Sequence, residues 1–180
     1  METHFKPKHY HRPGKIETIT QLLSQEGARI IAGGTDLFVN KTPEILSLID
    51  ITDLGLDYVK QHDEYVAIGT TTSFSQIIAS PYLEEQPLSI IKDSAWEIGH
   101  YNLRHIATIG GNICNAVPSA DSPIALIALD AIAVIEGPLG ERLVPLDGFF
   151  TLIHRLLFNK IMEFSKSIPV VFLNFRNLCK

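Results

Sequence analysis

The chain has 180 residues, of which 46% are hydrophobic and 19% are charged, and its formal net charge is −5. This length suits one domain, or two small lobes around a cleft, and can bury a core. The negative charge gives no attraction to nucleic acid or to an anionic membrane, and no apolar run reaches the roughly 18–20 residues of a membrane span. Two cysteines are too few for a disulfide framework or a self-contained zinc or iron–sulfur site. Because the N-terminus also lacks a secretory leader, we expect a cytoplasmic protein without a metal site of its own.

The N-terminal part of the chain predicts a short helix followed by a buried strand. Residues 1–15 are basic and polar, and their three histidines are conceivable metal ligands, although a solvated segment is the preferred interpretation. Residues 17–26 place apolar side chains at i, i+3 and i+4, which is the spacing of a short amphipathic helix, and Gly27 supplies a left-handed stop. The β-branched run at 28–32 then predicts a buried strand that ends at the pair Gly33–Gly34.

The rest of the chain predicts a mixture of strands and helices. Apolar runs indicate strands at 46–51 and 65–69. A helix follows, with Thr72 or Ser73 as its N-cap and Pro81 as its end. Because helices and strands alternate early and mix later, we expect an α/β or α+β fold, with α+β preferred. The remaining predicted elements are a helix at 87–98, an apolar helix joined to a strand at 124–137, and a hairpin turn with a strand at 137–146.

A pair of glycines interrupts the apolar segment IIAGGTDLFVN at residues 30–40. One glycine is enough for a turn, so a pair at a strand end suggests that the backbone approaches something other than protein. Glycines also let successive N–H groups converge on an anion. The segment has no lysine and matches neither GxxxxGK[ST] nor GxGxxG, which excludes a P-loop and a dinucleotide-binding Rossmann turn. A tight turn after the strand is an equally good interpretation of this segment alone.

A second glycine pair occurs in ATIGGNICNAVPSADSP at residues 107–123. Gly110–Gly111 follow Thr108 and precede Asn112, and Asp121 stands near the start of a helix, where an acid is often only a cap. Two such loops predict two walls of one groove, in which backbone N–H groups hold a diphosphate. Because no strong cation is present, we expect a dinucleotide cofactor rather than a nucleoside triphosphate substrate.

Three stretches resemble the FAD-binding subunit of the molybdenum hydroxylases, the family of xanthine dehydrogenase and carbon monoxide dehydrogenase. They are FKPKHYHRPGKIETITQLLSQEGARIIAGGTDL, the triplet Gly69-Thr70-Thr71, and NLRHIATIGGNICNAVPSADSPIALIALDA. The resemblance covers about residues 5–150. It implies an α+β fold of the PCMH type, in which a small N-terminal α/β lobe (residues 1–55) and a larger α+β lobe (residues 56–150) clasp an extended FAD.

The resemblance also implies which residues contact FAD. The first glycine loop matches the family loop that wraps the pyrophosphate with main-chain amides, Asp121 matches an acid that contacts the flavin nucleotide, and Ile98 falls at an apolar or aromatic contact. Arg104 matches a basic residue whose role is structural or functional. No catalytic side chain is implied, since the redox chemistry belongs to the cofactor; Cys114 is expected to be a packing residue. The implied cofactor-binding residues are Ile30, Ile31, Ala32, Gly33, Gly34, Thr35, Asp36, Leu37, Ile98, Thr108, Ile109, Gly110, Gly111, Asn112 and Asp121.

The partners implied by the resemblance are the other subunits of such a complex. A molybdenum-cofactor large subunit oxidises the substrate, a small subunit with two 2Fe–2S clusters passes the electrons on, and FAD delivers them to NAD or another acceptor. The substrate is therefore chosen on a different polypeptide.

Residues 151–180 depart from the family pattern. They carry five basic residues and one acidic residue, whereas the rest of the chain holds 10 basic and 19 acidic residues. We could not align this tail with the family, whose C-terminal domain is absent here; a disrupted reading frame is preferred over a natural amphipathic helix at 152–164. The tail keeps open an alternative function, a truncated, non-catalytic remnant with weak or no FAD binding. A free-standing flavin reductase of the cell-wall-precursor type is a weaker alternative, because it requires a C-terminal substrate domain.

Overall fold

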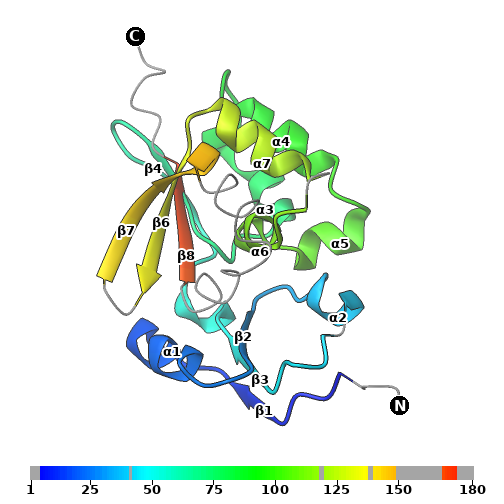
Figure 1. Cartoon of the computed structure of the whole chain (residues 1–180). Coiled ribbons are helices and arrows are strands. Elements are labelled where there is room, and N and C mark those ends of the chain that lie inside the picture. The colour runs from blue at the N-terminus through cyan, green and yellow to red at the C-terminus, as the bar shows by residue number, and fades with distance from the viewer. Residues whose placement is uncertain (1–4, 41, 118–119, 138–139, 149–167, 174–180) are drawn as a thin grey trace.

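The computed structural model describes residues 5–40, 42–117, 120–137 and 140–148, and the backbone of 168–173 (Figure 1). These residues form two lobes. The first lobe is a three-stranded parallel sheet in the order β1-β3-β2, with a helix packed on it. Its elements are β1 (His9–His11), α1 (Ile16–Leu23), β2 (Ala28–Ile31), α2 (Leu37–Asn40) and β3 (Ser47–Asp50).

The core of the first lobe lies between α1 and the sheet. Ile19 and Leu23 of α1 are buried against Ile49 and Ile51, as the amphipathic spacing predicts. Gly27 has φ +68°, which confirms the left-handed stop after the helix. Residues 9–11 of the segment expected to be solvated form the edge strand β1, which pairs with β3 in parallel, with His9 opposite Ser47, and leaves His9 and Tyr10 exposed.

The second lobe is a five-stranded antiparallel sheet in the order β4-β5-β8-β6-β7, with helices packed against it. Figure 1 shows the helices to the right of this sheet and the first lobe below them. The strands are β4 (Val59–Gln61), β5 (Val66–Ile68), β6 (Ile132–Gly137), β7 (Gly140–Pro145) and β8 (Ile168–Leu173). The helices are α3 (Phe74–Ala79), α4 (Ser89–Trp96), α5 (Tyr101–Ile106), α6 (Ile109–Asn115) and α7 (Asp121–Ala128), with short 3-10 turns at Thr52–Leu54 and Pro81–Leu83.

One apolar cluster forms the core of the second lobe. Phe74 and Ile77 of α3 and Ile109 and Ile113 of α6 are completely buried in it. The predicted cap of α3 is confirmed at Ser73, whose hydroxyl accepts a hydrogen bond from the backbone N–H of Gln76 in a capping box. This cap fixes the start of α3 directly after the Thr70–Thr72 segment.

The strand β8 comes from the segment that the sequence analysis describes as an atypical tail. Its backbone lies between β5 and β6, with residue 172 opposite Ile132 and residue 173 opposite Val66. The expected helix at 152–164 lies outside the described residues. None of the helices in the described part of the chain is both long and apolar enough to cross a membrane.

Candidate cofactor site

The first glycine pair lies between β2 and α2, on the side of the first lobe that faces α5. Gly34 has φ +69°, a conformation that favours glycine. A Cβ on Gly33 would overlap the backbone carbonyl oxygen of Ile106, at the end of α5. The expectation that both glycines make room for a non-protein group is therefore wrong. Backbone from the second lobe fills the space at Gly33, and the side chains of Phe38 and Ile31 fill it at Gly34, 2.8 and 3.1 Å from the Cβ position.

The backbone N–H groups of this first segment are free to bind an anion. In the described part of the chain, the N–H groups of Gly33, Gly34, Thr35 and Asp36 have no hydrogen-bond acceptor. Successive unpaired N–H groups at a strand end form a concave anion site. The other predicted residues of this segment support the loop: Ile31 is buried, and Leu37 packs against the apolar cluster of Ile31, Ile45 and Leu48.

The second glycine pair does not form a loop. Residues 109–115 are the helix α6, with Gly110 and Gly111 in its first turn and Thr108 as its N-cap. Gly110 is buried, and a Cβ on it would overlap the hydroxyl oxygen of Thr70. Gly111 is exposed, and an added Cβ would meet only the Thr108 hydroxyl oxygen, at 2.9 Å. Within this pair, only Gly111 leaves open space beside the helix.

The N–H groups of the first turn of α6 are all occupied by protein acceptors. Ile109 N–H donates to the Thr72 carbonyl and Gly110 N–H to the Thr70 carbonyl, both at 3.0 Å. Gly111 N–H donates to the Thr108 hydroxyl at 3.2 Å, and Asn112 N–H donates to the Thr108 carbonyl at 3.0 Å. The expectation that amides of both segments hold a diphosphate is therefore wrong for the second segment.

The segment Thr70–Thr72 lies against α6, which sequence reasoning did not predict. Gly69-Thr70-Thr71 entered only through the family resemblance and Thr72 only as a possible N-cap, yet the carbonyls of Thr70 and Thr72 anchor the start of α6. The hydroxyl oxygen of Thr71 is buried and has no hydrogen-bond partner in the described part of the chain. A threonine after a strand is too common a residue for its sequence position to have indicated this.

The other predicted site residues surround the two segments or support them. The hydroxyl of Ser122 donates to the side-chain carbonyl oxygen of Asn112 at 2.6 Å, which ties α7 to α6 and places the exposed Asp121 beside α6. Ile98 is half-buried, and its carbonyl accepts a hydrogen bond from Arg104 at 3.1 Å.

The structure shows the surroundings of Arg104 and Cys114, two residues near the second segment. Arg104 also donates to the carbonyls of Trp96 and Gly99, and its guanidinium lies 5.0 Å from the Trp96 ring centroid. Arg104 therefore has a structural role: its hydrogen bonds fix the end of α4. Cys114 lies on α6 with an exposed surface, whereas desolvation of its thiol raises the pKa to about 12, so its expected packing role stays a prediction.

A polar network braces the end of β3, which lies beside the end of β2 where the first segment begins. Asp50, at the end of β3, accepts hydrogen bonds from the hydroxyl of Tyr10, and from the N–H and hydroxyl of Thr52 at 2.8 and 2.6 Å. Arg12 lies 3.6 Å from the same carboxylate. Burial by itself would raise the pKa of Asp50, but the hydrogen bonds from Thr52 and Tyr10, followed by the charge of Arg12, outweigh it and lower the pKa below 3.8.

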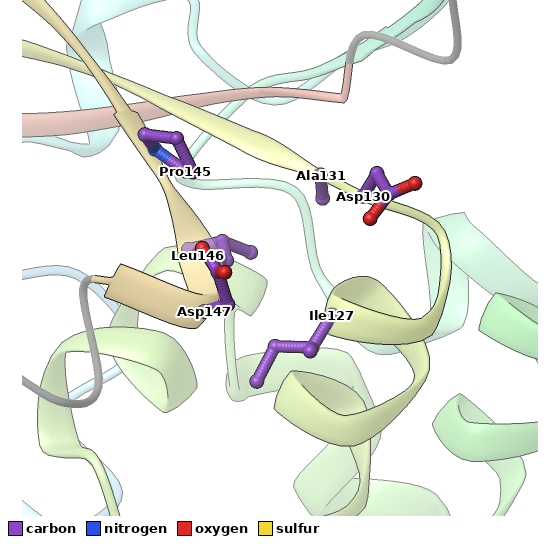
Figure 2. Close-up of a pocket in the computed structure, with 6 residues that line it drawn as sticks. All are labelled: Ile127, Asp130, Ala131, Pro145, Leu146 and Asp147. Carbon is purple, nitrogen blue, oxygen red and sulfur yellow. The ribbon is translucent and has the colours of Figure 1, made fainter. Parts of the chain in front are cut away.

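The cavity shown in Figure 2 lies apart from the glycine segments. It has a volume of about 110 Å³ and is lined by Ile127, Asp130, Ala131, Pro145, Leu146 and Asp147, at the end of α7 and the adjoining ends of β6 and β7. None of the predicted site residues lines it. A site for a small organic ligand usually has about 300–1,000 Å³, so this cavity is too small for a dinucleotide.

The residues present fit a diphosphate-containing cofactor held between the lobes. The first lobe offers four free N–H groups in sequence, the second offers the open side of Gly111, and the Thr71 hydroxyl between α6 and the sheet lacks a partner. Together with the fold, this arrangement defines a two-lobed nucleotide-cofactor domain.

Comparison with known proteins identifies the family. The chain belongs to the family described as the FAD binding domain in molybdopterin dehydrogenase, whose model matches residues 3–163. It is 32% identical over 148 residues to the xanthine dehydrogenase FAD-binding subunit of Escherichia coli O157:H7, covering 79% of this chain and 50% of that protein. It is 35% identical over 147 residues to the carbon monoxide dehydrogenase medium chain of Hydrogenophaga pseudoflava, covering 78% and 51%. The chain thus spans about half the length of these relatives.

Solved structures support the same assignment. The carbon monoxide dehydrogenase from Hydrogenophaga pseudoflava which lacks the Mo-pyranopterin moiety of the molybdenum cofactor superposes with a TM-score of 0.80 at 29% identity, covering 94% of this chain and 59% of that chain. Quinoline 2-oxidoreductase from Pseudomonas putida 86 gives a TM-score of 0.81 at 21% identity, covering 97% and 61%, and shows the fold alone. The predicted PCMH-type α+β fold and FAD as the cofactor are confirmed.

Proposed function

We propose that this chain is the FAD-binding subunit of a molybdenum hydroxylase complex. The observation that carries the proposal is the contact between lobes, in which Gly33 of the first segment packs against the Ile106 carbonyl just before the second segment. This contact brings the two family motifs to one place, with free N–H groups on one side and the open face of Gly111 on the other.

The residues of the chain bind and orient the cofactor rather than react. In this proposal the N–H groups of Gly33 to Asp36 donate to the diphosphate, and the exposed Asp121 accepts hydrogen bonds from the nucleotide. The bound flavin supplies the redox chemistry, accepting electrons from 2Fe–2S clusters and delivering them to NAD or another acceptor. The proposal includes a molybdenum-cofactor large subunit and a 2Fe–2S small subunit as partners, and a cytoplasmic location.

The test is retention of flavin by the purified chain. Wild-type protein is expected to show the visible absorption bands of oxidised flavin, as isolated or after addition of FAD and removal of the excess. A protein that remains colourless after this treatment contradicts the proposal. It would favour the alternative, a non-catalytic remnant with weak or no FAD binding.

A substitution at Gly111 tests the position of the cofactor. The variant Gly111→Val is expected to lose flavin, because its branched side chain fills the open space beside α6. An added Cβ would lie 2.9 Å from the Thr108 hydroxyl, which caps α6, so thermal unfolding of the variant is measured beside its flavin content to separate loss of flavin from loss of fold. Gly14→Val is the matched control, because Gly14 has nothing within 4 Å of its Cβ position and lies outside the site. Stoichiometric FAD in Gly111→Val would show that the second segment does not border the cofactor.

A further inference from the structure

The Thr71 side chain lies in a turn that is fixed on both sides by backbone hydrogen bonds. The turn closes through Thr72 N–H to the Gly69 carbonyl at 3.1 Å, and Thr71 N–H donates to the Leu56 carbonyl at 3.0 Å. The carbonyls of Thr70 and Thr72, on either side of Thr71, accept from Gly110 and Ile109 of α6. Thr71 is thereby held between the second glycine segment and the chain that leaves the first lobe.

The Thr71 hydroxyl is buried without a partner, unlike the neighbouring hydroxyls. The residue is 6% exposed, and its hydroxyl oxygen has no hydrogen-bond partner in the described residues. The hydroxyl of Thr72 donates to the Tyr58 carbonyl at 2.9 Å, and the hydroxyl of Thr108 accepts from Gly111 N–H. A buried unpaired hydroxyl destabilises a fold relative to valine, which has the same shape. The described residues therefore supply no hydrogen-bond partner for the hydroxyl at position 71.

The four backbone N–H groups at the start of α6 are not available to a diphosphate. They are occupied by Thr72, Thr70 and Thr108. A diphosphate that lies against this part of the second lobe is therefore expected to be bound by side-chain donors. Thr71 stands in the chain between Thr70 and Thr72, whose carbonyls anchor α6.

We propose that the Thr71 hydroxyl donates a hydrogen bond to a diphosphate oxygen of the bound FAD. The inference rests on the proposed function, because it needs FAD between the lobes. It assigns the hydrogen-bond donor of the second lobe to a side chain of the Gly69–Thr72 turn rather than to the helix start at Gly110–Gly111. Because the Thr71 hydroxyl is buried in the structure, the residues around it must move when FAD binds.

The experiment is a calorimetric titration of FAD into the cofactor-free full-length chain and its variants. Thr71→Val is expected to weaken FAD binding about tenfold or more, the effect of losing one hydrogen bond to a charged group. Thr71→Ser, which keeps the hydroxyl, is expected to stay within about twofold of wild type. Thermal unfolding of cofactor-free Thr71→Val is expected at the wild-type temperature or above, because the unpaired hydroxyl is gone.

Ser47→Ala is the matched control. Ser47 carries the other buried hydroxyl without a partner, and it lies at the start of β3, opposite Ala28, whereas the glycine segment follows Ile31 at the other end of β2. This variant is expected to leave FAD affinity unchanged. If Thr71→Val does not fold, Thr71→Ala removes the same hydroxyl with less bulk and takes its place in the titration.

A second ligand series identifies the contacted part of the cofactor. ADP, which has the diphosphate but no flavin, is expected to lose affinity for Thr71→Val in the same proportion as FAD, whereas riboflavin binding is expected to be unchanged. Wild-type protein that binds no FAD would overturn the proposed function and this inference with it. Wild-type binding with equal affinity in Thr71→Val, or an equal loss for riboflavin, would overturn this inference alone.

Discussion

At the scale of single residues, Asp50 shows how the polar chemistry of the first lobe supports the cofactor segment. The carboxylate is at the end of β3, and the next residue, Ile51, donates its N–H to the Ile31 carbonyl at 3.1 Å, directly before the glycine segment. A buried carboxylate is stable only when its oxygens are well paired. Its partners Tyr10, Arg12 and Thr52 come from β1 and from the turn after β3, so the network joins strands at the edge where the cofactor segment begins.

Removing the Tyr10 hydroxyl is expected to destabilise the protein. Tyr10→Phe deletes the hydrogen bond to Asp50, and a bond to a charged group typically contributes about 1.5–3 kcal/mol. Tyr10 is 59% exposed, so we expect a decrease of about 1 kcal/mol in the free energy of unfolding at pH 7, measured by urea denaturation. Tyr82→Phe, at another exposed tyrosine, is the control and is expected to have no effect. Equal stability of the two variants would contradict the role of Tyr10.

The same network predicts how stability depends on pH. Because the pKa of Asp50 is lowered in the folded state, its contribution to stability is fully present above the ordinary carboxyl pKa and is lost as pH falls through the folded value. The stability difference between wild type and Tyr10→Phe is therefore expected to be constant at neutral pH and to shrink below pH 3.8. Urea denaturation at pH 7, 5 and roughly 3 measures this; a difference that grows toward acid would reverse the sign and refute it.

Residue-scale reasoning found glycines at which a Cβ does not fit, but it gave the wrong reason for Gly33, Gly34 and Gly110, where protein atoms fill the space. Of these, Gly33 stands where the lobes meet. The sequence alone does not say what occupies the space. Gly33 faces the Ile106 carbonyl and Gly110 faces Thr70, and these contacts between distant parts of the chain are invisible to local patterns.

At the scale of elements, local signals predicted the longer helices and strands of the described residues but missed β1, α2, β4, α5, α6 and β8. Ser73 and Gly27 could be read as a cap and a stop because their roles depend on a few neighbouring residues. Two glycines disfavour a helix at 109–115, yet α6 forms because Thr108 caps it and Thr70 and Thr72 accept its first N–H groups. Tertiary hydrogen bonds outweigh a propensity deficit of about 1 kcal/mol per glycine.

Deleting residues 168–180 is expected to prevent stable folding of the second lobe. The strand β8 lies between β5 and β6, so its removal splits the five-stranded sheet into two hairpins, β4–β5 and β6–β7. An isolated two-stranded hairpin is only marginally stable, and both new edges expose unpaired N–H and carbonyl groups. We expect insoluble protein, or loss of cooperative unfolding by circular dichroism. Deleting residues 174–180 is the control, because it leaves β8 intact. A soluble, cooperatively folded chain lacking 168–180 would show that β8 is dispensable.

At the scale of the whole molecule, the two lobes are joined where the cofactor is proposed to bind. The backbone of Gly33 packs on the end of α5, and Leu56 links the first-lobe core to the Thr71 turn through its carbonyl. Binding of a cofactor between the lobes therefore depends on how closely they approach. The resemblance predicted two lobes around FAD, but it did not predict that one glycine of the first motif sets their separation.

Gly33→Ala tests this role of the lobe contact. The added methyl group overlaps a backbone carbonyl, which cannot move without displacing α5 or the first lobe. Overpacking of this kind costs about 1–3 kcal/mol, so we expect a melting temperature lower by roughly 2–10 °C and weaker FAD binding, because the first segment moves away from α6. Gly14→Ala, at a glycine with open space around it, is the control in both thermal unfolding and FAD titration. If Gly33→Ala melts and binds FAD as Gly14→Ala does, the lobes do not depend on this contact, and the closeness of the two glycine segments is no longer an argument for a shared cofactor.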